Sequence, residues 1–290
     1  MQFQAAYLGV ILIWTTTPLA IQWSSQGNSF LFAVTGRMVI GTLIALLLVW
    51  IFRLPMAWHQ RARRTYLAAA IGIYGAMMAV YWSAQFIPSG WISVIFALTP
   101  IITGILAVRW LGETTLTPLK LVGMLLGIIG MATIFYSGEQ LSDLAWIGVV
   151  GMVISVILHA SSSVLVKKAG YGANGLVITT GGLLVSAPLY LLTWFLTGSE
   201  WPTSIPQRSA WSILYLGVIG SVLGFALYYF VLKHLGPTRV ALITLITPVT
   251  ALWLGHVFNG ESIDVTVITG TAFILSGLGL YEWGERVVQQ

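Results

Sequence analysis

The chain has 290 residues, of which 58% are hydrophobic and only 7% are charged, and its mean hydropathy is +0.91. A soluble domain carries about 25% charged residues, so these values exclude a water-soluble fold and a disordered chain. The remaining class is a membrane protein that crosses the bilayer many times. The sequence has no cysteine, which excludes disulfides, thiolate metal sites and cysteine nucleophiles.

Apolar stretches close to the roughly 20 residues that a membrane helix needs recur along the chain. Short clusters of Gly, Pro, Asn, Ser or charged residues separate them. They predict ten spans, near residues 4–22, 30–52, 65–85, 91–111, 117–137, 144–166, 174–197, 210–233, 237–258 and 264–284. We therefore expect an all-α polytopic membrane protein with ten transmembrane helices and no separate extramembrane domain.

The placement of Lys and Arg in the short loops predicts the orientation, because cytoplasmic loops are enriched in these residues. With the N-terminus inside, one residue, Arg208, lies in an outside loop and Arg37 lies within a span. The inside loops and C-terminus hold the other eleven of 13: Arg53, Arg61, Arg63, Arg64, Arg109, Lys120, Lys167, Lys168, Lys233, Arg239 and Arg286. Both termini are therefore expected to be cytoplasmic. The formal net charge of +5 then reflects membrane topology and not nucleic-acid binding.

The two halves of the sequence correspond at an offset of 148 residues. Leu98-Thr99-Pro100 falls on Ile246-Thr247-Pro248, and Gly112-Glu113 falls on Gly260-Glu261. Each half, 4–137 and 144–284, contains five predicted spans. Because five is odd, the second half is expected to enter the membrane in the opposite orientation. Inverted repeats of this kind are typical of alternating-access transporters with a midplane substrate site.

These motifs resemble the drug/metabolite transporter superfamily, whose EamA-type members have two tandem copies of one domain. The resemblance covers nearly the whole chain. It is carried by Trp14-Thr15-Thr16-Thr17-Pro18, by Gly36-Arg37, and by the repeated Thr-Pro and Gly-Glu block. It implies a ten-helix, two-bundle permease, often an exporter of amino acids or other small metabolites, without fixing the substrate. The second half departs from the first, since it has nothing like Arg37 in its second span.

Pro100 and Pro248 each remove a helical hydrogen bond near the middle of a predicted span. Their symmetric placement predicts a pair of hinges that border the transport path. The alternative is an ordinary kink, since proline is common in membrane helices.

Arg37 is the one basic residue inside a predicted span. A guanidinium that faces lipid costs at least about 2.5 kcal/mol, so Arg37 is expected to face the bundle. It could anchor a substrate carboxylate or phosphate through its fork of donors. It could equally be structural, bonded to helix-end carbonyls or to Glu139 or Asp143.

His159 shares a helical face with Ser155 and with Ser162 or Ser163. Its imidazole could carry a coupling proton, or it could be a neutral group that hydrogen-bonds between helices. No second base or carboxylate accompanies it at depth, which argues against an intramembrane enzyme.

Aromatic side chains within the spans form the rest of the predicted pocket, because rings with a few hydroxyls suit an amphipathic metabolite. Interfacial belts of Trp and Tyr are the alternative interpretation. The candidate substrate-binding residues are Trp14, Thr17, Arg37, Tyr74, Tyr81, Trp82, His159, Tyr228, Tyr229 and Trp253.

Two Gly-x-x-x-Gly motifs, Gly123 with Gly127 and Gly220 with Gly224, permit close helix contact. They are compatible with a homodimer face, and packing within one chain is the alternative.

The sequence therefore predicts a secondary transporter in the cell membrane that exports small metabolites such as amino acids. A multidrug exporter, which would not need Arg37, is the alternative within the same class. The expected partners are a small-molecule substrate and the lipid bilayer. No catalytic residue, metal site, cofactor or nucleic-acid partner is expected.

Overall fold

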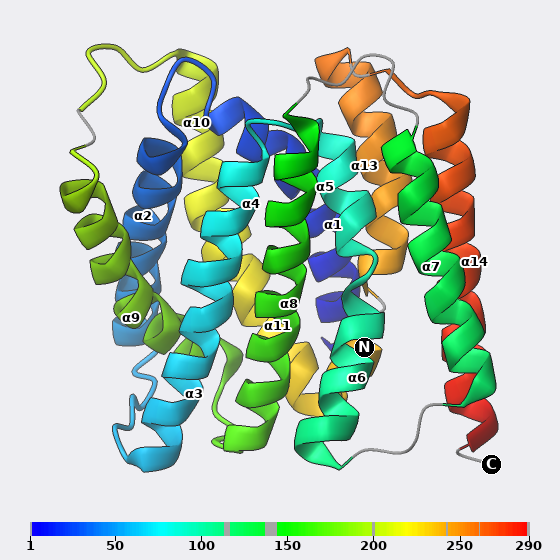
Figure 1. Ribbon diagram of the computed structural model, residues 1–290. Coiled ribbons are helices and arrows are strands. Elements are labelled where there is room, and N and C mark those ends of the chain that lie inside the picture. Colours follow the sequence, from blue (N-terminus) through cyan, green and yellow to red (C-terminus); the bar gives the residue numbers. More distant parts are fainter. Residues whose placement is uncertain are drawn as a thin grey trace.

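The computed structural model describes residues 2–112, 117–136, 144–198, 201–241, 243–260 and 262–288. Every regular element within these ranges is a helix. Figure 1 shows the helices side by side, with their axes running roughly between one end of the molecule and the other.

The helices of the first half mostly follow the predicted spans. Two of these spans consist of more than one helical segment. In chain order the segments are α1 (Gln2–Ser24), α2 (Phe30–Ile51), α3 (Gln60–Ala70), η1 (Ile71–Ala76), α4 (Met77–Ser83), α5 (Ser89–Phe96), α6 (Thr99–Leu111) and α7 (Pro118–Tyr136).

The second half begins with two uninterrupted helices, and a π-helical segment again divides the helix that follows. Its segments are α8 (Ala145–Ala169), α9 (Gly175–Leu196), α10 (Gln207–Tyr215), η2 (Leu216–Leu223), α11 (Gly224–His234), α12 (Pro237–Ala241), α13 (Ile243–Asn259) and α14 (Val265–Val288).

Seven helical stretches are long and apolar enough to cross a membrane, among the residues that the structure describes. They correspond to α1, α2, α3 to α4, α5 to α6, α8, α9 and α10 to α11. Two shorter apolar helices lie at Pro118–Gly130 and Val265–Tyr281. Large aliphatic and aromatic side chains are exposed all along these helices, as expected for a surface that faces lipid. The protein is therefore a multi-pass membrane protein.

The span predicted near 65–85 begins earlier, at Gln60. The His59 imidazole accepts a hydrogen bond from the Ala62 amide at 3.3 Å and caps this helix. The first turns expose Arg61, Arg63 and Arg64. This basic part of the helix lacks the apolar signal on which the span was predicted, so the hydrophobic pattern placed its start too late.

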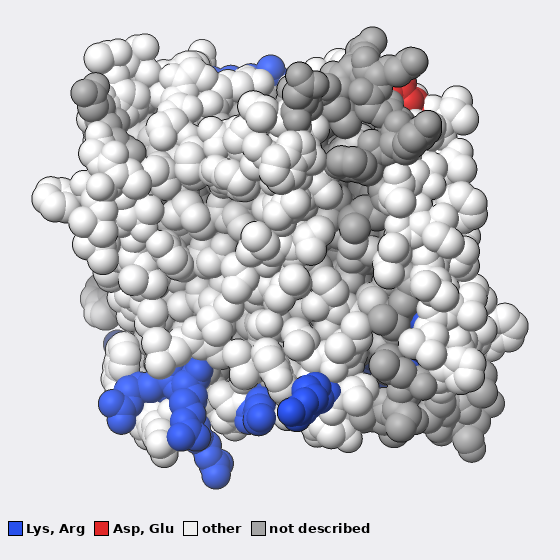
Figure 2. Space-filling model, in the orientation of Figure 1, with Lys and Arg blue, Asp and Glu red and all other residues white. Residues whose placement is uncertain are grey.

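Most described Lys and Arg side chains lie at one end of the molecule. This basic end contains the start of α3 and the ends of α6, α8 and α11. Figure 2 shows their blue surface along the lower edge, while the middle of this face has almost no charge. A charge-free band between polar ends is what a protein in a bilayer requires.

Two π-helical segments, η1 and η2, interrupt the third predicted span of each half. Shifted by 148 residues, η1 falls on 219–224 and overlaps η2. Hydroxyl groups donate to three carbonyls of η1. Tyr190 donates to the carbonyls of Ile73 at 2.7 Å and Tyr74 at 3.1 Å, and Ser155 donates to that of Ala76 at 2.9 Å. Such segments are frequent at functional sites.

Gly112 and Gly260 correspond at the same offset and end equivalent helices. Gly112 follows α6 with φ of 71°, and Gly260 follows α13 with φ of 66°. Glycine adopts this left-handed conformation without the steric cost that a side chain brings. The acidic residue of each Gly-Glu pair, Glu113 or Glu261, lies outside the described residues.

Glycines allow α7 and α14 to pack with their backbones in contact. A Cβ added at Gly277 would collide with the Gly123 carbonyl oxygen, and one added at Gly130 would collide with that of Gly270. Gly127 likewise faces Ile101 of the same chain, and Gly220 and Gly224 face Arg37 and Ile13. The two Gly-x-x-x-Gly motifs are thus used for packing within the chain.

The two predicted hinge prolines have different surroundings. The helix is interrupted between α5 and α6, and Pro100 stands in the first turn of α6. Pro248 lies inside α13. Both side chains are buried, and neither contributes to the wall of the central cavity described below. Hinge motion at either proline stays a prediction.

Candidate functional site

A cavity lies in the middle of the helix bundle. Its volume is about 60 Å³, which is room for a few water molecules. Segments from both halves form its wall: α1, α2, α4 and α5 from the first, and α8, η2, α11 and α13 from the second. The lining residues are Trp14, Thr17, Pro18, Ile21, Arg37, Met77, Val80, Ile92, Ser93, Phe96, His159, Gly220, Phe225, Thr244 and Thr247.

Four of the candidate substrate-binding residues line this cavity together: Trp14, Thr17, Arg37 and His159. They come from the consecutive helices α1 and α2 and from α8, which lies in the other half of the chain. The predicted spans near 91–111, 210–233 and 237–258 also contribute hydroxyl and aromatic groups to the wall. These are Ser93 and Phe96, Phe225, and Thr244 and Thr247, respectively.

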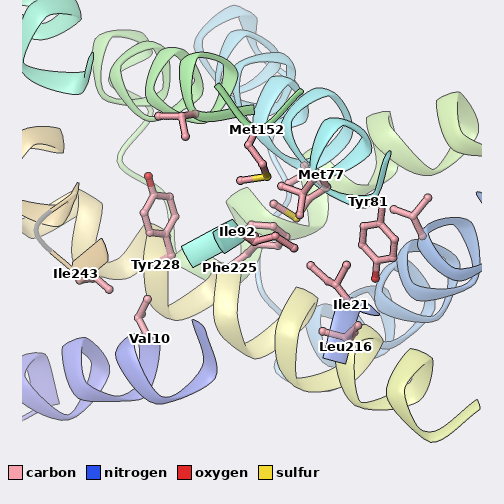
Figure 3. Packing of buried hydrophobic residues seen from close by; sticks show 14 of the residues in the cluster. Val10, Ile21, Met77, Tyr81, Ile92, Met152, Leu216, Phe225, Tyr228 and Ile243 are labelled. Carbon is pink, nitrogen blue, oxygen red and sulfur yellow. The ribbon is translucent and has the colours of Figure 1, made fainter. Parts of the chain in front are cut away.

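Two further candidates lie next to residues of the wall. The Tyr81 ring is 5.9 Å from the Arg37 guanidinium carbon. The Tyr228 ring packs 5.1 Å from Trp14 and 5.4 Å from His159, between ring centroids. Figure 3 shows Tyr81 and Tyr228 on opposite sides of Ile92 and Phe225, two residues of the cavity wall.

The remaining four candidates lie elsewhere. The Tyr74 hydroxyl is 2.6 Å from the Thr193 hydroxyl on α9. Trp82 is 37% exposed, and its ring packs on Phe86. Trp253 is 63% exposed on α13. Tyr229 borders a separate pocket at the basic end, beside Lys167 and Lys233.

Met77 and Val80 line the cavity but were not singled out in the sequence. Tyr74 and Tyr81, two candidates on this span, would share one face if the segment between them were α-helical. That segment includes part of η1, where π hydrogen bonds join residues i and i+5 and turn the following side chains around the helix axis. Met77 and Val80 therefore face the cavity.

Arg37 is the most unusual group in the wall, because its side chain is 1% exposed. Its Nε donates to the Ser221 hydroxyl of η2 at 2.8 Å. Its Nη1 is buried and has no hydrogen-bond partner. No carboxylate among the described residues forms an ion pair with it. Glu139 and Asp143, the acidic partners predicted for a structural Arg37, lie outside the described residues.

His159 stands in a cluster of aromatic rings. Its ring centroid is 5.5 Å from that of Trp14 and 5.6 Å from that of Phe96. The serine hydroxyls near it donate to backbone carbonyls: Ser155 to Ala76, Ser162 to Ala68 and Ser163 to Ala160. The His159 imidazole thus packs against rings and does not activate a described serine.

A network of polar contacts, here called the polar seal, crosses the bundle at the end opposite the basic end. Trp23 Nε1 donates to the Asn259 side chain at 3.1 Å, and Asn259 donates to Gln22 at 3.0 Å. Gln22 in turn donates to the Ile87 carbonyl at 2.9 Å. The Arg208 guanidinium stacks 3.8 Å from the Trp23 ring. These contacts join α1, α10 and α13 above the cavity.

The described residues contain no group of three or more His, Cys, Asp or Glu side chains that could hold a metal ion. What the cavity offers is one buried cation, several hydroxyls and an aromatic and aliphatic wall.

The structure thus defines a multi-pass helical membrane protein with a mixed polar and aromatic cavity that both halves of the chain line. Residues 4–136 and 146–282 each match the EamA-like transporter family. The chain belongs to this family and contains two tandem copies of its domain.

Several proteins that this chain resembles are named as transporters. It is 25% identical over 247 residues to the uncharacterized transporter YvbV of Bacillus subtilis, covering 83% of this chain and 80% of that one. It is 23% identical over 280 residues to a probable terminal-alkyne amino-acid exporter of Streptantibioticus cattleyicolor, covering 92% of each. A protein of known crystal structure shares the fold with a TM-score of 0.68 at 17% identity, covering 98% of each chain.

Proposed function

We propose that this protein is a secondary transporter that exports small metabolites such as amino acids, by alternating access around the central cavity. The observation that carries the proposal is that both EamA copies contribute to the cavity wall. A site at the junction of two repeats can be reached from either side when one repeat rocks against the other.

The proposed architecture is ten spans arranged as two inverted five-helix repeats. Helix directions support it: in Figure 1, α6 runs toward the basic end and α13 runs away from it, and α7 and α14 are also opposed. The overlap of η1 with η2 and the equivalent glycines after α6 and α13 add to that support. Besides the seven long apolar stretches, the three remaining spans would be formed by α7, by α12 with α13, and by α14.

The proposed location is the cell membrane, with both termini in the cytoplasm. The gathering of Lys and Arg at one end of the described chain supports this orientation, because cytoplasmic ends are enriched in these residues.

The proposed substrate contacts are Trp14, Thr17, Arg37 and His159, with Tyr81 and Tyr228 beside them. Amino acids are favoured because a buried cation and an apolar wall suit a molecule with a carboxylate and a side chain. The name of the Streptantibioticus relative, an amino-acid exporter, points to the same class.

Two alternatives are less well supported. A multidrug exporter of hydrophobic compounds would gain nothing from the buried Arg37. An intramembrane enzyme would need an activated nucleophile, whereas the described serines near His159 bond to carbonyls.

Counterflow in proteoliposomes tests the proposal. Vesicles containing purified protein are loaded with unlabelled amino acids, and uptake of the radiolabelled forms is measured beside uptake of a lipophilic cation. We expect exchange of amino acids above the level of protein-free vesicles. Exchange of the lipophilic cation alone would replace the proposal with the multidrug alternative.

A further inference from the structure

Two buried donors lack acceptors, one on a residue of the cavity wall and one on a residue beside that wall. One is Arg37 Nη1, which has no partner although Nε of the same guanidinium is held by Ser221. The other is the Tyr81 hydroxyl, which is fully buried and also has no partner. The Tyr81 ring lies 5.9 Å from the guanidinium carbon.

Unmade hydrogen bonds of this kind are costly, because buried polar groups lose their water without gaining a partner. A buried positive charge without a counter-charge is costlier still. Ser221 is neutral, so its hydroxyl satisfies one N–H and leaves the charge of Arg37 uncompensated. The arrangement is that of a site prepared for an anion with at least two acceptor oxygens.

We propose that Arg37 and Tyr81 together bind the carboxylate of the transported molecule. This inference rests on the proposed function and adds which group of the substrate is recognised. Arg37 supplies the charge and a guanidinium N–H to one carboxylate oxygen, and the Tyr81 hydroxyl donates to the other. Charge-assisted hydrogen bonds are the strong ones, and the planar guanidinium matches a planar carboxylate.

The rest of the cavity indicates what the carboxylate is attached to. Ile92, Met77 and Phe225 form an apolar wall beyond Arg37. Figure 3 shows the Tyr81 hydroxyl directed to the side where Ile21, another residue of this wall, lies. The substrate is therefore a carboxylate with an apolar side chain, such as a hydrophobic amino acid.

Equilibrium binding to the purified full-length protein tests the site. The probes are radiolabelled L-phenylalanine, L-leucine and phenethylamine, the last being phenylalanine without its carboxyl group. Arg37→Lys keeps the charge and loses the fork, and Tyr81→Phe removes one hydroxyl. Tyr74→Phe is the matched control, because its hydroxyl meets Thr193 away from the cavity. Folded protein is quantified for each variant by size-exclusion chromatography.

We expect the amino acids to bind more tightly than phenethylamine to the wild-type protein. Arg37→Lys and Tyr81→Phe should each weaken amino-acid binding about ten-fold or more, since each removes a hydrogen bond to a charged group. Phenethylamine binding should change less than about two-fold, and Tyr74→Phe should behave as the wild type.

Equal weakening of amino acids and phenethylamine by Tyr81→Phe would overturn the inference and make the residue structural. Tight binding of phenethylamine with no binding of either amino acid would also overturn it, while counterflow of another solute could still uphold the proposed transport. Wild-type affinity of folded Arg37→Lys for both amino acids would show that the carboxylate does not bind the Arg37 guanidinium.

Discussion

At the scale of single residues, buried side chains with hydrogen bonds can be separated from buried side chains without them. The Tyr190 hydroxyl is buried and bonded to two carbonyls of η1, whereas Tyr81 and Arg37 Nη1 have no partner. All three side chains are fully buried, so burial alone does not distinguish a structural role from a binding role. The hydrogen-bond partners do.

Tyr190→Phe is predicted to destabilise the protein by about 1–3 kcal/mol, because the two carbonyls of η1 would lose their buried donor. Thermal unfolding of the purified protein measures this. Tyr74→Phe is the control: its ring lies edge-on to that of Tyr190 with the centroids 4.9 Å apart, but Thr193 keeps a second partner in the Leu189 carbonyl. Equal melting temperatures for the two variants would show that Tyr190 does not hold η1.

At the scale of helices, α7 and α14 form a pair whose contact depends on glycine. Membrane helices associate through close packing of small residues, because lipid supplies no hydrophobic driving force between them. Since α7 and α14 are the last helices of the two EamA copies, their contact also joins the two copies outside the cavity.

Gly277→Ala is predicted to destabilise the protein by about 1–3 kcal/mol, since the added methyl would force α14 away from Gly123. Gly279→Ala on the same helix is the matched control, because nothing lies within 4 Å of a Cβ added there. The control should be neutral or slightly stabilising, as alanine favours helix over glycine. Thermal unfolding in detergent compares them, and identical behaviour of the two variants would refute the close contact.

Loss of the polar seal is predicted to make the cavity more accessible. Asn259→Ala removes the side-chain bonds to Trp23 and Gln22, which together contribute about 1–3 kcal/mol. A single cysteine at Ser93 on the cavity wall, in this cysteine-free chain, reports access from outside the cell. Its labelling by an impermeant maleimide should become roughly ten-fold faster.

Asn174→Ala is the control for the seal, because Asn174 caps α9 through the Leu176 amide at 2.9 Å and lies away from the seal contacts. It should leave the labelling rate of the Ser93 cysteine unchanged. If Asn174→Ala accelerates labelling as much as Asn259→Ala does, the effect is general loosening and not the opening of a seal.

The hydrophobic pattern predicted most of the helix positions, because ten long apolar stretches leave few alternatives. Arg37 at a cavity could be predicted from the cost of a charge in lipid. The π turn η1 could not be predicted, since no residue pattern distinguishes Ile71–Ala76 from an α-helix. It turns the side chains that follow it around the helix axis, so that Met77 and Val80 line the cavity. Trp82 and Trp253 show the same limit for aromatic residues, which suit a lipid surface as well as a pocket.

At the scale of the whole molecule, orientation in the membrane decides which end of the cavity faces the cytoplasm. Single cysteines at Gln60, at the basic end, and at Thr203, in the exposed segment between α9 and α10, test it. We expect an impermeant reagent added to intact cells to label position 203 and not position 60. The reverse pattern would invert the proposed topology.

The central claim is that substrate crosses the membrane through the cavity between the two EamA copies. Amino-acid counterflow by Ser93→Trp tests it most directly, because the added indole would fill the cavity. Leu47→Trp, at an exposed position of α2, places the same group on the outer surface. With equal amounts of folded protein in the vesicles, we expect Ser93→Trp to exchange no more than protein-free vesicles and Leu47→Trp to match the wild type. Wild-type exchange by folded Ser93→Trp would contradict the claim.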